Sequence, residues 1–358
     1  MDDRHNTARE IASTPAQVET PQVPHLHVVE GAGSAARDPG LRARSVDGAA
    51  VMFAMLAVLI VPAILTLRTV KNPGLLSFST DNPTPLGYTW SLSLWLIPAF
   101  AILGWLHHNP SYQLPRKAFW MTVLPLSLLG ASLDILFGNT FFVFPNKGSV
   151  VGLYIWGLDF STGQAEWPRT LPIEEFVFYL SGFVAALLLY LWSDIFWFGR
   201  YVKDSDLRTS RRRPQVKLHW PSALIGLGLT AAAFLFKKFG PVSHEGIPGY
   251  FTFLMAASFI PSSLLFDSVR KYINWQAFSF VSMVMLLISL MWEATLGVPY
   301  GWWDYNPKMM IGVFIGAWAS LPIEAPLVWI LVSFTTVIIY EAVHMLVVSR
   351  SAPGGGGT

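Results

Sequence analysis

The segments TLPIEEFVFYL at residues 170–180 and SLPIEAPLVWI at residues 320–330 share a Leu-Pro-Ile-Glu core, and each leads into a long apolar stretch. Proline is favoured in the first turn of a helix, and a glutamate there complements the helix dipole. Both segments therefore predict the start of an apolar helix. They also place Glu174, Glu175 and Glu324 in the first turns of two such helices. Carboxyl groups next to an apolar segment are unusual and require an explanation.

The composition indicates a helical membrane protein. Of the 358 residues, 53% are hydrophobic and 13% are charged, with a mean hydropathy of +0.46. Soluble proteins carry about 25% charged residues. The absence of cysteine excludes disulfides and cysteine-ligated metals. Apolar runs, each approaching the ~20 residues that cross a bilayer, predict eight helices. They lie at about 51–67, 88–106, 118–137, 172–198, 219–236, 250–267, 276–296 and 319–348.

The basic residues predict the orientation. With a cytoplasmic N-terminus, 17 of the 24 Lys and Arg residues lie in inside segments and 7 in outside loops, as the positive-inside rule requires. Both termini of this multi-pass protein are then cytoplasmic. Residues 1–48 are interpreted as a disordered cytoplasmic tail, 199–218 as a basic cytoplasmic linker and 350–358 as a flexible C-terminal tail.

The remaining segments, 49–198 and 219–349, are predicted to be repeats of each other. Each has an acid near the end of its third helix, then a loop with Trp near Asp, then the Leu-Pro-Ile-Glu motif, at offsets of 159, 145 and 150 residues. Four spans per half is an even number, so both halves have the same orientation. We expect an all-α polytopic membrane protein with about eight transmembrane helices in two parallel four-helix repeats. The matched residues are Asp134 with Glu293, Trp156 and Asp159 with Trp303 and Asp304, and Glu174 with Glu324.

This topology gathers the acids on one side of the membrane. An intramembrane carboxylate costs ~2.5–3.5 kcal/mol on insertion scales and is a functional candidate. Helix capping explains the Glu of each motif taken alone, but Asp134 and Glu293 lie near helix ends where the dipole does not favour an acid. Burial and a neighbouring carboxylate both favour a protonated carboxyl group. The candidate catalytic residues are Asp134, Glu174, Glu175, Glu293 and Glu324.

A protonated carboxyl group in an apolar setting can transfer its proton to a double bond, and aromatic faces can shield the carbocation that results. Phe178 and Tyr179 lie one helical turn after Glu174 and Glu175. The candidate substrate-binding residues are Phe178, Tyr179, Trp156, Asp159, Trp303, Asp304 and Trp329. Glu341 and His344 are also one turn apart, but two ligands do not make a metal site, and we expect no metal.

Paired repeats, each with a Pro-x-Glu-Glu-type motif and an upstream acid, resemble the integral-membrane, non-flavin lycopene cyclase family in its single-chain form. The resemblance covers about residues 51–348, with LPIEEFVFY at 171–179 a good match and LPIEA at 321–325 a partial one. It implies protonation of a terminal double bond of lycopene, ring closure and proton loss to a β-ionone ring. It also implies that Glu174, Glu175 and Glu324 act as acid or base and that no redox cofactor is consumed.

Ala325 stands where a second acid is expected, and Pro326 follows it, so the two halves are chemically unequal. This leaves open a different ring type (epsilon or gamma), a different isoprenoid substrate, and the number of substrate ends that react. A non-catalytic lipid or carotenoid transporter is a third alternative, since duplicated bundles with membrane acids suit transporters. The expected partners are lycopene or a similar long polyene and membrane lipids. Other carotenoid-biosynthesis enzymes or a second copy of the chain are further candidates, and no nucleic acid is expected.

Overall fold

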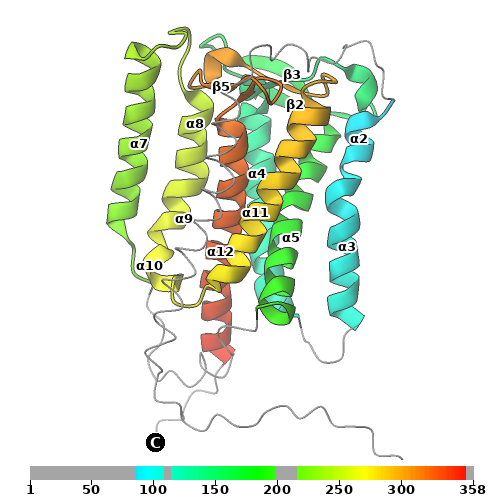
Figure 1. Ribbon diagram of the computed structural model, residues 1–358, viewed down its shortest axis with the longest axis vertical. Coiled ribbons are helices and arrows are strands. Elements are labelled where there is room, and N and C mark those ends of the chain that lie inside the picture. Colours follow the sequence, from blue (N-terminus) through cyan, green and yellow to red (C-terminus); the bar gives the residue numbers. More distant parts are fainter. Residues whose placement is uncertain (1–84, 109–113, 199–215, 352–358) are drawn as a thin grey trace, which may run out of the picture. The chain divides into compact units, whose positions relative to one another are not determined.

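The computed structural model describes residues 85–108, 114–198 and 216–351. Most of them are helical, and six helices are long and apolar enough to cross a membrane (Figure 1). The prediction of a polytopic helical membrane protein is confirmed at this level. The six are α2 (Gly87–Ser91) joined to α3 (Ser93–His108), α4 (Arg116–Phe141), α5 (Ile173–Phe196), α7 (Trp220–Phe239), α11 (Trp275–Trp292) continued by the π-helical turn η4 (Glu293–Gly297), and α12 (Glu324–Ser351).

These helices correspond to six of the eight predicted segments. The predicted segment 319–348 begins later than expected, at Glu324, because Leu321–Pro322 form strand β6. The residue before a proline disfavours helical backbone, so the chain stays extended up to the proline. The predicted span 51–67 and the predicted tail 1–48 lie outside the described residues, as do most of the segments 199–218 and 350–358.

The segment predicted as a helix at 250–267 is interrupted. It consists of α8 (Gly249–Leu254), the π-helical turn η3 (Met255–Phe259), α9 (Ile260–Leu264) and α10 (Phe266–Val269). Pro261 has no N–H, and its ring crowds the preceding turn. A π-helical turn just before it accommodates this crowding by widening the helix. The apolar part, Gly249–Leu264, is shorter than the six long helices.

Three small antiparallel sheets and two 3-10 turns lie at one end of the bundle, and the sequence analysis did not anticipate them (Figure 1). Strand β2 (Tyr154–Asp159) pairs with β3 (Glu166–Pro172) as a hairpin. The other strands are two residues long: β1 (Phe142–Val143) pairs with β4 (Asp304–Tyr305), and β5 (Phe314–Ile315) pairs with β6. The turns are η2 (Lys147–Ser149) and η5 (Pro307–Met309).

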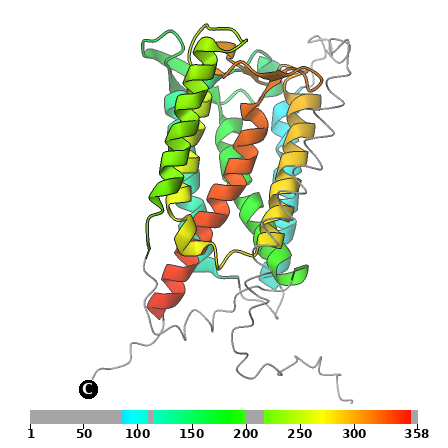
Figure 2. The same cartoon turned by 60° about the vertical axis from the view of Figure 1, so that its left-hand side comes forward.

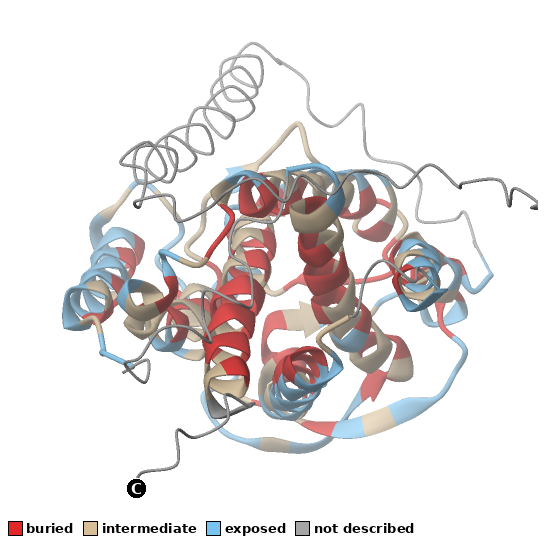
Figure 3. Cartoon of the chain, turned by 90° about the horizontal axis from the view of Figure 1, so that it is seen from below, coloured by how far each residue is buried: buried red, intermediate tan, exposed pale blue. Residues whose placement is uncertain are grey.

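Helices α5 and α12 pack against each other and against α4 and α11 (Figures 1 and 2). Buried residues concentrate on the faces that these helices turn toward one another, as the end-on view shows (Figure 3). In the apolar part of α12, 61% of the residues are buried, compared with 28% in α7. Because many apolar side chains of α7 are exposed, this helix is suited to contact with lipid.

Two asparagines, Asn146 and Asn306, connect loops to distant helix ends in the same way. The backbone N–H of Asn146 donates to Gly301 O (2.9 Å), and its side-chain amide donates to Tyr300 O (3.1 Å). The backbone N–H of Asn306 donates to Phe141 O (2.8 Å), and its side-chain amide donates to the carbonyl one residue earlier (3.1 Å). Each asparagine side chain also accepts a bond from the backbone two residues on. Each asparagine thus holds its loop to a segment that is 154 or 166 positions away in sequence.

We predict that Asn306→Ala lowers the free energy of unfolding by about 1–3 kcal/mol, because it leaves a buried carbonyl without its donor and removes the turn that the amide oxygen closes. Thermal unfolding in detergent measures the change. Ser243→Ala, at an exposed position, is the control. An unchanged unfolding temperature for Asn306→Ala would show that these contacts do not stabilise the fold.

Candidate active site

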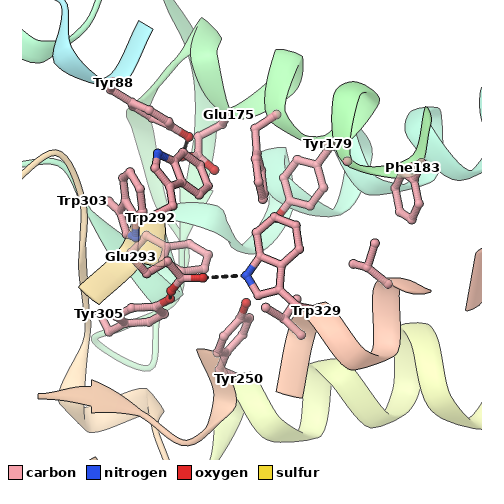
Figure 4. Close-up of a pocket in the computed structure, with 15 residues that line it drawn as sticks. Tyr88, Glu175, Tyr179, Phe183, Tyr250, Trp292, Glu293, Trp303, Tyr305 and Trp329 are labelled. Carbon is pink, nitrogen blue, oxygen red and sulfur yellow. Dashed lines mark hydrogen bonds between the residues drawn. The ribbon is translucent and has the colours of Figure 1, made fainter. Parts of the chain in front are cut away.

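Two carboxyl groups lie in one small aromatic cavity near the end of the bundle that carries the sheets (Figure 4). Glu175 comes from the first turn of α5, and Glu293 begins the π-helical turn η4. Both side chains are buried, and both line this cavity. The cavity has a volume of about 60 Å³. It is lined by Tyr88, Phe142, Glu175, Phe178, Tyr179, Gly182, Phe183, Tyr250, Trp292, Glu293, Trp303, Tyr305, Val328, Trp329 and Val332.

Glu175 accepts a hydrogen bond of 2.5 Å from the hydroxyl of Tyr88, which is buried at the start of α2. The Tyr88 ring packs against Trp303 and Trp292, with centroid distances of 5.0 and 6.0 Å. The bond joins two side chains that are 87 positions apart in sequence. The contact therefore both orients the carboxyl group and ties α2 to α5.

Glu293 has two donors from different elements. The indole Nε1 of Trp329 in α12 donates to it at 2.6 Å, and the hydroxyl of Tyr305 in β4 donates to its other oxygen (Figure 4). Burial, and then the nearby Glu293 charge, raise the pKa of Tyr305, so its phenol keeps the proton that it donates. Two donors stabilise a carboxylate more than one does.

Indole and phenyl rings form the cavity wall. Trp329 stacks on Trp95 at 4.8 Å with an interplanar angle of 11°, and Phe178 lies 5.3 Å from both Trp292 and Trp329. Trp292 also packs on Trp303 at 4.6 Å. Aromatic faces attract cations and exclude water. The arrangement can therefore hold a proton donor and a proton acceptor around an apolar, transiently cationic group.

Glu174 and Glu324 have a different role from Glu175 and Glu293, because neither lines the cavity. Both are fully buried, at 1% and 0% exposure. Glu174 accepts a 2.7 Å bond from the backbone N–H of Val151, and Glu324 a 2.6 Å bond from that of Ile311. Glu174 also accepts from the hydroxyl of the α2 threonine at position 89 (2.5 Å). The two side chains attach matching loops to the first turns of α5 and α12.

Asp134 is buried in α4 behind the cavity wall. It accepts a hydrogen bond of 3.5 Å from the hydroxyl of Tyr179, and Tyr179 itself lines the cavity. Tyr179 and Trp329, which donate to Asp134 and Glu293, each lie five positions after the glutamate of a Leu-Pro-Ile-Glu motif. Asp134 therefore interacts with the cavity through one aromatic ring.

The predicted substrate-binding residues divide into two groups. Phe178, Tyr179, Trp303 and Trp329 line the cavity. Trp156, Asp159 and Asp304 do not: Trp156 is 63% exposed on β2, Asp159 accepts from the backbone of Ser161 (2.8 Å), and Asp304 accepts from the backbone of the next residue (2.7 Å). The predicted equivalence of the two Trp–Asp loops is therefore wrong. Trp156 and Asp159 lie in the β2–β3 hairpin, whereas Trp303 forms part of the cavity wall.

Six aromatic residues of the site were not anticipated: Tyr88, Phe142, Phe183, Tyr250, Trp292 and Tyr305. Trp292 directly precedes Glu293 and Tyr305 directly follows Asp304, so adjacency to a predicted residue was a usable signal. No local signal marks Tyr88 and Tyr250, which start helices far from either motif.

Glu341 and His344 lie in α12, far along the helix from Glu324. Glu341 accepts a 2.8 Å bond from the Tyr190 hydroxyl, and His344 stacks on Tyr340 at 5.4 Å. Among residues 85–108, 114–198 and 216–351, no group of three or more His, Asp or Glu side chains is placed to hold a metal ion.

Comparison of the chain with protein-family models, with curated proteins and with solved structures found no match in any of the three.

We predict that Gly297→Ala displaces Trp303 from the cavity wall, because a Cβ on Gly297 would lie 2.2 Å from the Trp303 ring. Overpacking of this kind costs about 1–3 kcal/mol. A lower unfolding temperature and a changed tryptophan emission spectrum are expected. The control is Gly228→Ala in α7, where an added Cβ meets nothing within 4 Å and alanine favours the helix. Equal behaviour of the two variants would contradict the tight contact.

Proposed function

We propose that this chain is an integral-membrane cyclase that protonates a terminal double bond of lycopene, or of a similar linear polyene, and closes a β-type ring. The observation that carries the proposal is the pair Glu175 and Glu293, buried in one aromatic cavity within helices that are apolar enough to span a membrane. The resemblance of the two Leu-Pro-Ile-Glu segments to integral-membrane lycopene cyclases points to the same reaction.

In the proposed mechanism, Glu175 is the acid and Glu293 the base. Glu175 transfers its proton to the terminal double bond, and the electrons of the next double bond attack the cation to form a six-membered ring. The ring cation then loses a proton to Glu293, whose two donors, Trp329 and Tyr305, stabilise the carboxylate before this step. No electrons are gained or lost overall, so the product has the mass of the substrate.

The aromatic wall has two tasks in this mechanism. It excludes water, which would otherwise capture the cation as an alcohol. It also presents ring faces to the positive charge while the ring forms. Trp292, Trp303 and Phe178 lie around both carboxyl groups and are suited to these tasks.

We further propose that the chain is built from two parallel repeats, 49–198 and 219–349, with eight spans and both termini in the cytoplasm. The reciprocal contacts of Asn146 and Asn306 support this, as do the matching bonds of Glu174 and Glu324. In such a repeat Ala325 corresponds to Glu175. The proposed acid then comes from the first repeat and the proposed base from the second, so that together they form one site, which holds one end of a substrate at a time.

Ala325 also supports a second candidate function, which is cyclisation of another isoprenoid or formation of an epsilon or gamma ring. The position of the proton that Glu293 removes decides the ring type, while the acid step stays the same. A purely transporting role receives less support, because the glutamates at 174, 175, 293 and 324 lie in the end turns of their helices, whereas transporter sites lie near the membrane midplane.

We predict that cells accumulating lycopene convert it to a cyclised product of the same mass when they express this chain, and that Glu175→Gln reduces conversion by about 10²–10⁴-fold, the usual contribution of a general acid. Glu174→Gln is the matched control, because the amide keeps an oxygen to accept from Val151 and Thr89. Pigment chromatography with mass spectrometry is the measurement. Unchanged lycopene, with the protein folded in the membrane, would falsify the proposed substrate. Full activity of Glu175→Gln would reject its role as acid.

The absence of native cysteines allows a direct test of orientation. We predict that a membrane-impermeant maleimide labels Thr162→Cys, in the β2–β3 turn, from outside intact cells. Ser210→Cys, in the basic segment 199–218, should react only after the cells are made permeable. The reverse pattern would invert the proposed orientation.

A further inference from the structure

A second, larger cavity lies beside the first, between α4, α7 and the α8–η3 segment. Its volume is about 470 Å³, within the range of about 300–1,000 Å³ that is typical of small-molecule sites. It is lined by Leu133, Phe137, Thr140, Phe141, Phe160, Phe234, Ile247, Gly249, Thr252, Phe253, Ala256, Ala257 and Met309.

This apolar cavity offers nothing to a polar ligand. Its only polar side chains are Thr140 and Thr252, and both hydroxyls are engaged. Thr140 accepts from the backbone N–H of Phe160 (2.9 Å), and Thr252 donates to the carbonyl of Pro248 (2.8 Å). No charged residue lines it. A hydrocarbon is the ligand class that such a lining accommodates without leaving a polar group unpaired.

One layer of aromatic rings separates the apolar cavity from the carboxyl groups. Phe141 and Gly249 line the apolar cavity, while their chain neighbours Phe142 and Tyr250 line the acid cavity. The Tyr250 ring lies 5.1 Å from Phe141 and 5.3 Å from Phe142. Joining the two spaces would require these rings to move to other side-chain rotamers.

The acid cavity is too small to hold a substrate by itself. At about 60 Å³ it has room for only a few water molecules, whereas the proposed substrate is a long chain that must extend beyond its reacting end. The apolar cavity is the adjoining space of sufficient size. A phospholipid chain would fit the lining as well, but no charged lining residue is present there to hold its headgroup.

We therefore propose that the apolar cavity binds the hydrocarbon chain of a linear isoprenoid, next to the end that reacts at Glu175 and Glu293, and that the rings of Phe141, Phe142 and Tyr250 separate the two parts. This inference rests on the proposed function, because it assigns the cavity to the substrate of the same reaction. It also identifies α8 and η3, the π-helical segment, as part of the substrate site.

Photolabelling of the unmodified full-length protein in lipid nanodiscs tests occupancy without requiring turnover. The probe is a linear C20 isoprenoid hydrocarbon with a diazirine at mid-chain. We expect labelled peptides that contain Leu133, Phe253 or Met309. We also expect an excess of unlabelled linear isoprenoid to suppress the labelling. Labelling elsewhere, or suppression by added phospholipid instead, would overturn it.

Ala257→Phe tests the role of the cavity in turnover, because it places a ring inside it. We expect KM for the full-length polyene to rise by about tenfold or more, since a misfit of this size in an apolar pocket is worth 1–3 kcal/mol. KM for a ten-carbon analogue with the same terminal alkene should stay unchanged. Ala232→Phe adds the same ring at an exposed position of α7 and is the matched control. An equal effect on both substrates, or none on either, would contradict the inference.

The two experiments separate this inference from the proposed function. Isoprenoid-specific labelling without any cyclised product would leave the cavity assignment standing and remove the proposed reaction. Cyclisation of the long polyene with no labelling in the cavity, and with normal kinetics for Ala257→Phe, would keep the reaction and reject the cavity as its substrate site.

Discussion

A carboxyl group inside a membrane-spanning bundle must find its hydrogen-bond donors within the protein, because lipid supplies none. This requirement organises the end of the bundle that carries the sheets. Glu293 brings together η4, β4 and α12 through Tyr305 and Trp329, and Glu175 brings α2 to α5 through Tyr88. Much of the packing between these elements follows from satisfying two acids.

The four buried glutamates meet this requirement in two different ways. Glu174 and Glu324 receive backbone N–H groups of loops, so their bonds fix the course of the chain between helices. Glu175 and Glu293 receive side-chain donors from aromatic residues, so they remain at the surface of a cavity. A backbone donor closes a loop over the carboxyl group, whereas a phenol or indole leaves one side of it open to a ligand.

The aromatic residues connect stability with the proposed chemistry. The rings that shield the carboxyl groups also belong to the buried core: Trp292, Trp329 and Tyr88 are almost fully buried and pack on one another through Trp95 and Trp303. Large rings bury much apolar surface, and their faces attract positive charge. A cation formed in this cavity would meet a wall that is already rigid, so stabilising it would need little rearrangement.

Helix positions were predictable from the sequence because hydropathy and length are local properties. Six long helices match expected spans from 88 onward, whereas the segment 250–267 is interrupted. The acids of both Leu-Pro-Ile-Glu motifs lie in the first turns of α5 and α12. The Trp–Asp loops show the limit of this approach. Trp156 and Trp303 look equivalent by composition, but only Trp303 enters the cavity, because the segment after Tyr154 pairs with β3 instead.

What only the tertiary structure decided is which residues meet. Tyr88 reaches Glu175 across 87 positions of sequence, and Tyr250 lies against rings from two other segments. No periodicity links such distant positions, since each depends on how whole helices pack. The sequence by itself determined a helical membrane bundle with acids near the ends of its helices. The fold determined that two of those acids share one aromatic cavity, because their hydrogen-bond donors come from elements that only packing brings together.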